Sequence, residues 1–151
     1  MYHKILLPTD GSELASAGIT AGIAFAKQIE AQVVAVFVAG NYQYPIYIDI
    51  IPPNTPTEAD YQATMRTVGD SYLEAARTLA EEAGVSFTGV VEFNDSAAKQ
   101  IVRTACQQGC DLIFMGSHGR SGLGQLLLGS TTAKVLSLCD IAVLVHRTKV
   151  R

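Results

Sequence analysis

Residues 111–136 read DLIFMGSHGRSGLGQLLLGSTTAKVL, an apolar run followed by a glycine-rich segment and a stretch of helical pattern. The run DLIFMG is typical of a strand covered on both faces. Five glycines lie between Met115 and Leu136, and a helix is expected from about Ser130. Glycines at this density cost conformational entropy unless the backbone does something that a Cβ would prevent. The stretch predicts either a loop whose backbone approaches a ligand or a plain loop with turn glycines.

The rest of the chain alternates between the same two patterns. Further strands are expected at KILLP near the N-terminus, at Val33–Val38, in the half-covered, edge-like segment 85–93 and at Ile141–Val145. Strands separated by helices form right-handed βαβ units. We therefore predict an α/β fold over one domain, residues 1–151. The predicted fold is Rossmann-like. It has a single, doubly wound parallel sheet of five strands in the order 3-2-1-4-5, with helices on both faces.

The helices between these strands carry apolar stripes and end signals. One runs from about Ser12 to Ile29, and a second from Glu58 to Ala83 with Thr57 as N-cap and Gly84 as stop. A third starts after Asp95 or Ser96. The first is expected to bury Leu14, Gly18, Ala21, Phe25 and Ile29, and the second Tyr61, Met65, Val68, Tyr72, Ala76, Leu79 and Ala83.

Composition excludes several classes of function. The net charge is −3 without a basic stripe, which argues against a nucleic-acid partner. No apolar run reaches the length of a membrane span, and the first one is too short for a signal peptide. The three cysteines, Cys106, Cys110 and Cys139, are expected to be buried thiols of a cytoplasmic protein rather than a disulfide framework.

An irregular insertion follows the second strand. Residues Asn41 to Pro56 contain four prolines and three tyrosines and cannot form a regular element. Because ligands of open α/β sheets bind at the carboxyl ends of strands, the insertion is interpreted as a partial lid, a partner surface or a plain variable loop.

The glycine-rich segment has the features of a phosphate site. Gly116 is expected at the carboxyl edge of the sheet, and Gly129, Ser130 and Thr131 open the last helix. Amide groups at a helix start lack intrahelical partners and carry part of the positive dipole, while serine and threonine add hydroxyl donors. The P-loop and dinucleotide motifs are both absent.

The spacing Gly116-x2-Gly119-x9-Gly129-Ser130 resembles the nucleotide-binding signature of the universal stress protein family. The whole segment MGSHGRSGLGQLLLGS, and not only its glycines, resembles that signature. The segments KILLPTDGS and AVLVHR resemble the family's first and last strands. The glycines are those that the family's ATP-binding branch keeps. The resemblance implies ATP as the ligand, alone or with Mg²⁺.

The resemblance also implies which residues hold the nucleotide. The phosphates and ribose would contact Gly116, Gly119, Gly129, Ser130 and Thr131, and the adenosine would contact Pro8, Thr9, Asp10, Val38 and Met115. Asp10 has an alternative role as N-cap of the first helix. His118 and Arg120 are candidate phosphate contacts, with solvent-facing side chains as the alternative.

No set of nucleophile, base and orienting group is evident, so catalysis beyond weak ATP hydrolysis is not expected. The resemblance implies an ATP-regulated binding or signalling module in stress response. Edge pairing through Ile141 to Val145 would make a homodimer, as in the family, alongside an unidentified protein partner. The alternatives are a slow ATP hydrolase of the same fold and a nucleotide-free interaction scaffold.

Overall fold

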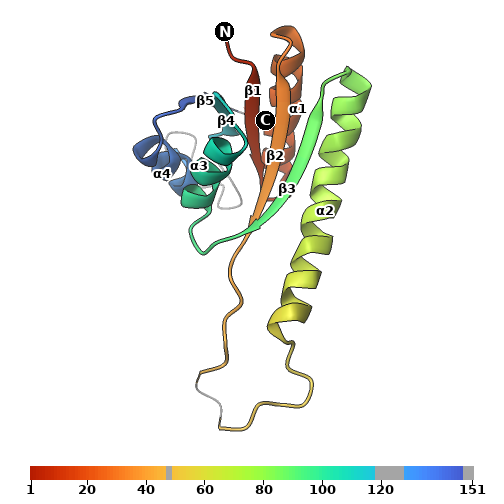
Figure 1. Ribbon diagram of the computed structural model, residues 1–151, viewed down its shortest axis with the longest axis vertical. Coiled ribbons are helices and arrows are strands. Elements are labelled where there is room, and N and C mark those ends of the chain that lie inside the picture. Colours follow the sequence, from red (N-terminus) through yellow and green to blue (C-terminus); the bar gives the residue numbers. More distant parts are fainter. Residues whose placement is uncertain (47–48, 118–127, 148–151) are drawn as a thin grey trace.

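The computed structural model describes residues 1–46, 49–117 and 128–147. Five strands alternate with four helices along the described chain (Figure 1). The strands are β1 (Lys4–Thr9), β2 (Gln32–Ala39), β3 (Phe87–Phe93), β4 (Leu112–Gly116) and β5 (Ala142–His146). The helices are α1 (Glu13–Gln28), α2 (Glu58–Ala83), α3 (Ala97–Gln107) and α4 (Ser130–Leu138).

The sheet has the predicted topology. Its order is β3-β2-β1-β4-β5, and every neighbouring pair is parallel. Leu6 at the centre pairs with Val34 of β2 and Ile113 of β4, and all three are fully buried. The predicted Rossmann-like α/β fold is confirmed, with β3 and β5 as the edge strands.

Two apolar clusters hold the helices against the sheet. On one face, α1 and α2 pack Ile19, Ile23 and Leu73 against the strands. On the other, α3 and α4 pack Ile101 and Val135. Because each face of the sheet carries its own cluster, its central strands are buried on both sides, as their continuous apolar runs predicted. No helix in the described part of the chain has the length and apolar character needed to cross a bilayer.

The helix ends follow the side chains that cap them. Thr57 and Asp60 form a complete capping box at α2, which ends at Gly84 in the left-handed conformation, as predicted. Ser96 caps α3. The alternative role of Asp10 as N-cap of α1 is wrong. Ser12 holds that position, accepting a hydrogen bond from the Ala15 amide, because Asp10 lies two residues too early.

The predicted stripes of α1 and α2 are confirmed at Gly18 and Ala76 and are otherwise displaced by about one residue. The most buried positions of α1 are Gly18, Ile19, Gly22, Ile23 and Ala26, and those of α2 are Gly69, Leu73, Ala76 and Ala80. Leu79, predicted to be buried, is 37% exposed. The physical reason is close approach: a Cβ on Gly22 would lie 2.5 Å from Leu7, so the glycines face the sheet and larger side chains flank them.

The prediction of three buried thiols holds for one of them. Cys110 is buried, and its burial raises the pKa of the thiol to about 11. Cys106 is exposed in the last turn of α3, and Cys139 after α4 is half-buried. The difference follows from the end of α3 at Gln107, which puts Cys106 on the helix and Cys110 beyond it, at the sheet.

Candidate functional site

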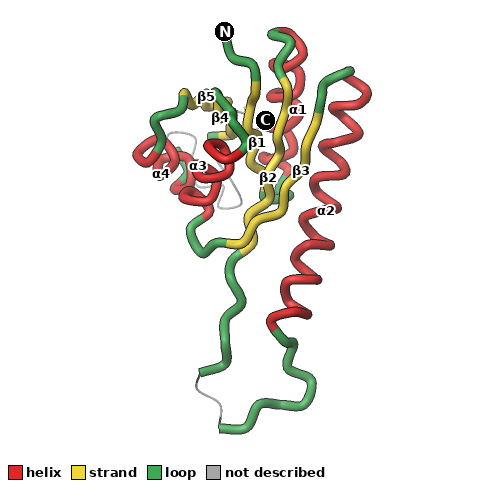
Figure 2. The backbone as a smooth tube through the Cα atoms, in the orientation of Figure 1, coloured by secondary structure: helices red, strands yellow, loops and turns green. Residues whose placement is uncertain are grey.

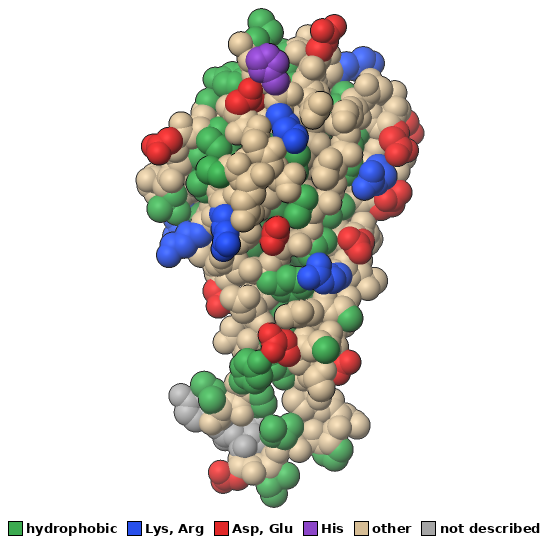
Figure 3. Space-filling view, viewed as in Figure 1, with side chains coloured by type: hydrophobic (Ala, Val, Ile, Leu, Met, Phe, Trp, Pro, Cys, Tyr) green, Lys and Arg blue, Asp and Glu red, His purple; other side chains and the backbone are tan. Residues whose placement is uncertain are grey.

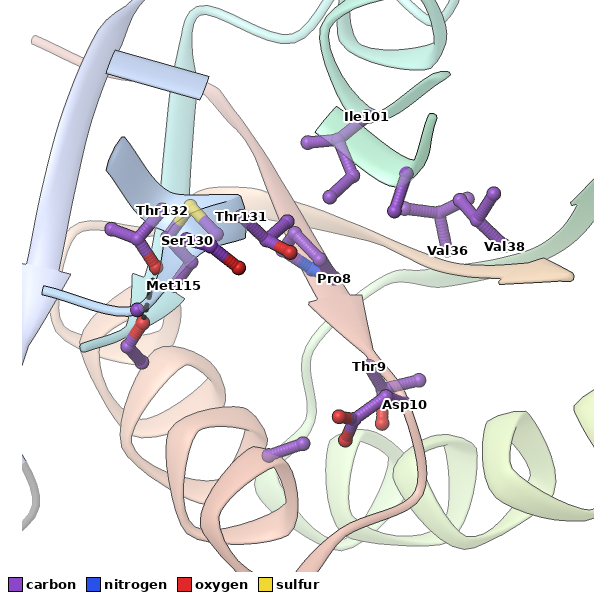
Figure 4. Close-up of a pocket in the computed structure, with 14 residues that line it drawn as sticks. Pro8, Thr9, Asp10, Val36, Val38, Ile101, Met115, Ser130, Thr131 and Thr132 are labelled. Atoms are coloured by element: carbon purple, nitrogen blue, oxygen red, sulfur yellow. Dashed lines mark hydrogen bonds between the residues drawn. The ribbon is translucent and has the colours of Figure 1, made fainter. Parts of the chain in front are cut away.

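A cavity of about 310 Å³ opens at the carboxyl ends of β1, β2 and β4 (Figure 4). The first turn of α4 closes one side, and α3 closes another. Strand order reverses here, because β2 and β4 lie on opposite sides of β1. Such a switch point is where open α/β sheets bind ligands. The lining residues are Pro8, Thr9, Asp10, Ala15, Val36, Val38, Ala97, Ile101, Met115, Gly116, Gly129, Ser130, Thr131 and Thr132.

The start of α4 presents backbone donors to this cavity. Gly129 is the N-cap and contributes no side-chain hydrogen bond to the first turn. Its own amide donates to the Ser117 carbonyl at 2.7 Å, and the Thr132 hydroxyl donates to the Gly116 carbonyl at 3.0 Å. These two bonds fix the helix start against the end of β4. The first-turn amides of Ser130 and Thr131 have no intrahelical acceptor and carry the positive end of the helix dipole.

The β1–α1 turn holds the acidic group of the site. The Ser12 amide donates to Asp10 Oδ1 at 3.0 Å, and the Gly11 amide donates to the Thr9 hydroxyl at 3.2 Å. Gly11 has a φ of 76°, in the left-handed region where glycine is favoured. The turn therefore orients the Asp10 carboxylate through its own backbone. Figure 4 shows Asp10 and Thr9 across the cavity from Ser130 and Thr131.

A third part of the wall is apolar. Val36 and Val38 of β2 and Ile101 of α3 lie together on one side of the cavity, as Figure 4 shows, and Met115 of β4 also contributes. Val36 and Met115 are almost fully buried, at 1% and 7% exposure. The cavity thus has an apolar wall, a carboxylate at the end of β1, and the amides and hydroxyls of the first turn of α4.

Nine of the twelve site residues predicted from the sequence line this cavity. They are Pro8, Thr9, Asp10, Val38, Met115, Gly116, Gly129, Ser130 and Thr131. The other three, His118, Gly119 and Arg120, lie outside the described residues. Sequence reasoning missed Ala15, Val36, Ala97, Ile101 and Thr132. Val36 and Ile101 were expected only as core residues. An apolar pattern predicts that a residue is buried, but it does not indicate whether that residue borders a cavity.

The described lining carries little charge. Asp10 is the one charged side chain among the described lining residues, and no lysine or arginine joins them. Within residues 1–46, 49–117 and 128–147, no three His, Cys, Asp or Glu side chains are placed to hold a metal ion. The arrangement suits a ligand with an apolar planar part, hydroxyl groups and an anionic end.

Known proteins are similar to this chain in both sequence and fold. The model of the universal stress protein family matches residues 1–147. Universal stress protein MJ0531 of Methanocaldococcus jannaschii is 32% identical over 150 residues, which cover 96% of this chain and 82% of that protein. Universal stress protein YxiE of Bacillus subtilis is 29% identical, with coverage of 97% and 100%. The solved structure of protein MJ0577 has a TM-score of 0.80 at 28% identity, covering 100% and 99% of the two chains.

More distant solved structures share the fold and contain nucleotides. A universal stress protein in complex with cAMP has a TM-score of 0.69 at 19% identity and covers 98% of each chain. The Archaeoglobus fulgidus protein with dAMP has a TM-score of 0.64 at 16% identity, with coverage of 95% and 97%. An Arabidopsis thaliana member with AMP bound has 0.65 at 14% identity, with coverage of 97% and 92%.

Proposed function

The chain belongs to the universal stress protein family, and from this premise we propose that it binds ATP in the cavity at the start of α4. We further propose that the protein is a homodimer of the cytoplasm. It would act in stress response as a binding or signalling module that the bound nucleotide regulates. The observation that carries the proposal is the convergence of nine predicted nucleotide contacts on one cavity. Support also comes from distant members of the fold that hold cAMP, dAMP and AMP.

The start of α4 suits the phosphates. Anions are stabilised at helix N-termini because amide hydrogens and the helix dipole point at them. Ser130 and Thr131 add hydroxyl donors, and Gly129 leaves the approach to their amides free of a side chain. Gly119, His118 and Arg120 are the further candidate phosphate contacts from the sequence. Because the net charge of the chain is −3, these local donors rather than a global positive field would hold the phosphates.

The opposite side of the cavity suits adenosine. The apolar side chains of Val36, Val38 and Ile101 can cover the faces of a purine, whose burial is favourable by roughly 25 cal/mol per Å² of apolar surface. Asp10 lies in the β1–α1 turn and lines the cavity, where its carboxylate can accept hydrogen bonds from ribose hydroxyls. The three parts of the wall therefore suit the three chemical parts of ATP: purine, ribose and phosphates.

Replacing Asp10 with asparagine is expected to weaken ATP binding about tenfold, because charge-assisted hydrogen bonds contribute about 1.5–3 kcal/mol. Asparagine retains an Oδ1 acceptor for the Ser12 amide, so the turn and the thermal midpoint should stay as in the parent. Titration calorimetry with ATP, run with Mg²⁺ and again with EDTA, measures both the affinity and the metal requirement. No heat of binding for the parent under either condition would refute the proposed function.

The homodimer part of the proposal depends on the outer edge of β5, which pairs with no other strand among the described residues. The His146 carbonyl accepts a hydrogen bond from the Ser117 amide, so the backbone groups of His146 face β4. Backbone direction alternates along a strand, so those of Val143 and Val145 face the outer edge. An edge strand with outward-facing backbone donors and apolar side chains favours pairing with a second copy.

Replacing Val143 with proline is expected to give a monomer, because it removes an outward amide and leaves the bonds to β4 intact. Multi-angle light scattering of the purified variant measures this mass. Leu144→Pro is the matched comparison, since it removes an inward amide and should lower the thermal midpoint. A folded Val143→Pro variant that stays dimeric would place the interface elsewhere.

A further inference from the structure

The segment between β2 and α2 projects far from the body of the molecule. We call residues 40–46 and 49–61 the arm; it comprises the described part of the insertion and the first turn of α2. Figures 1 and 2 show it continuing away from the sheet in the direction of α2. No described residue of the arm lines the cavity, so the lid interpretation gains no support from the described structure.

The arm is a built structure whose two limbs are bonded to each other. The Tyr42 hydroxyl donates to the Pro56 carbonyl at 2.7 Å, and the Tyr61 hydroxyl donates to the Gly40 carbonyl at 2.8 Å. The Tyr42 ring packs on Tyr44 and Tyr61, with centroid distances of 5.0 and 5.8 Å. The Tyr44 hydroxyl is hydrogen-bonded to Glu58. Three tyrosines thus join the outgoing limb to the returning one.

The base of the arm is also fixed to the body. The Asn41 amide donates to Asp95 Oδ1 at 2.9 Å, which ties the outgoing limb to the β3–α3 connection. The returning limb enters α2 through the Thr57 and Asp60 capping box. Hydrogen bonds from Thr57 lower the pKa of Asp60, which keeps this carboxylate charged. These contacts preorganise residues 40–44 and 56–61, so this part of the arm loses little conformational entropy when a partner binds.

Large apolar side chains lie exposed on the arm. Ile46 and Ile50 are 80% and 81% exposed, Tyr44 is 64% exposed and Ile51 is 60% exposed. Figure 3 shows hydrophobic side chains gathered on the arm, below the mixed polar surface of the body. Grouped exposed apolar residues mark interaction surfaces, whereas scattered ones need no explanation.

The charge of the arm indicates the chemistry of its partner. Residues 40–61 contain Asp49, Glu58 and Asp60 and no lysine or arginine. Pairing of two arms would bring like charges together, which disfavours a symmetric arm-to-arm contact. An anionic lipid surface would repel the same carboxylates. Charge complementarity therefore favours a polypeptide segment that carries basic residues beside apolar ones.

We propose that the arm is a docking surface for a basic amphipathic polypeptide segment of another protein. The isoleucines would pack against its apolar face, and the carboxylates would contact the lysines or arginines on its rim. The nucleotide cavity takes no part in this contact. The proposal therefore stands or fails separately from ATP binding.

The test uses the full chain and a labelled 18-residue peptide of leucine and lysine at helical spacing, with a leucine–glutamate peptide as control. Fluorescence anisotropy should detect the lysine peptide and not the glutamate one. The double variant Ile50→Asp, Ile51→Asp should bind at least about tenfold more weakly, and Ile50→Val, Ile51→Val should stay within about threefold. Asp49→Lys should also weaken binding.

Three results would overturn the proposal. Equal affinity of the parent and the aspartate variant for the lysine peptide would show that binding occurs elsewhere. Binding to phosphatidylcholine–phosphatidylglycerol vesicles without binding to the peptide would assign the isoleucines to a lipid surface. Self-association in sedimentation that the aspartate variant abolishes, again without peptide binding, would assign them to a second copy. Circular dichroism and thermal melting verify that each variant is folded.

Discussion

Replacing Gly129 with valine is expected to lower the affinity for ATP by about 30-fold or more. Gly129 has φ −57° and ψ 150°, which any residue adopts, so the variant should keep its backbone. The branched side chain would stand at the N-cap, beside the amides of Ser130 and Thr131. Loss of one hydrogen bond from such an amide to a charged phosphate corresponds to about 1.5–3 kcal/mol. Titration calorimetry measures the change.

The control for this variant lies in the same helix. Ser137→Val, an exposed position near the other end of α4, should bind ATP like the parent. Adenosine, which lacks phosphates, should lose far less affinity than ATP in the Gly129 variant. Equal losses for ATP and adenosine would mean that Gly129 acts on the shape of the whole cavity.

Replacing Gly11 with alanine is expected to lower the free energy of unfolding by about 3 kcal/mol. Its positive φ alone costs an alanine about 1–2 kcal/mol. A Cβ at Gly11 would also overlap the ring of Tyr72, which packs edge-on against Phe37 at 5.5 Å. Moving the ring to relieve that overlap is expected to weaken its contact with Phe37 and so the packing of α2 on β2. Urea unfolding followed by circular dichroism measures the difference.

Gly84 provides a matched control. Its φ of 73° is close to that of Gly11, yet nothing lies within 4 Å of an added Cβ. Gly84→Ala should therefore lose only about 1 kcal/mol, the strain of the left-handed backbone. The excess loss at Gly11 isolates the overlap with Tyr72. Equal losses in the two variants would show that the ring moves away without cost.

Much of the fold was predictable because its signals are local. Continuous apolar runs such as Val33–Val38 predict strands covered on both faces, and the Thr57 and Asp60 pair predicts the start of α2. Right-handed crossovers predict a parallel, doubly wound sheet, and the alternation of residues 85–93 predicts an edge strand. The full order 3-2-1-4-5, which the structure confirms, has no such local signal, since several orders obey the same crossover rule.

The helix faces and parts of the cavity depend on tertiary contacts. The stripe of α2 was centred on large residues such as Tyr72, whereas the sheet is approached most closely at Gly69, where a Cβ would lie 2.5 Å from Phe37. Ile101 and Ala97 line the cavity because the chain places the start of α3 over β2. The shape of the arm depends on tyrosine contacts between its two limbs, which composition cannot specify.

Nuclear magnetic resonance tests most directly whether the amides at the start of α4 hold the phosphates. The full chain, labelled with ¹⁵N, would be titrated with ATP and separately with adenosine. We predict that the Ser130 and Thr131 amide resonances move strongly with ATP and little with adenosine, while those near Val38 respond to both. Saturating ATP that leaves the Ser130 and Thr131 amides unchanged would contradict the account.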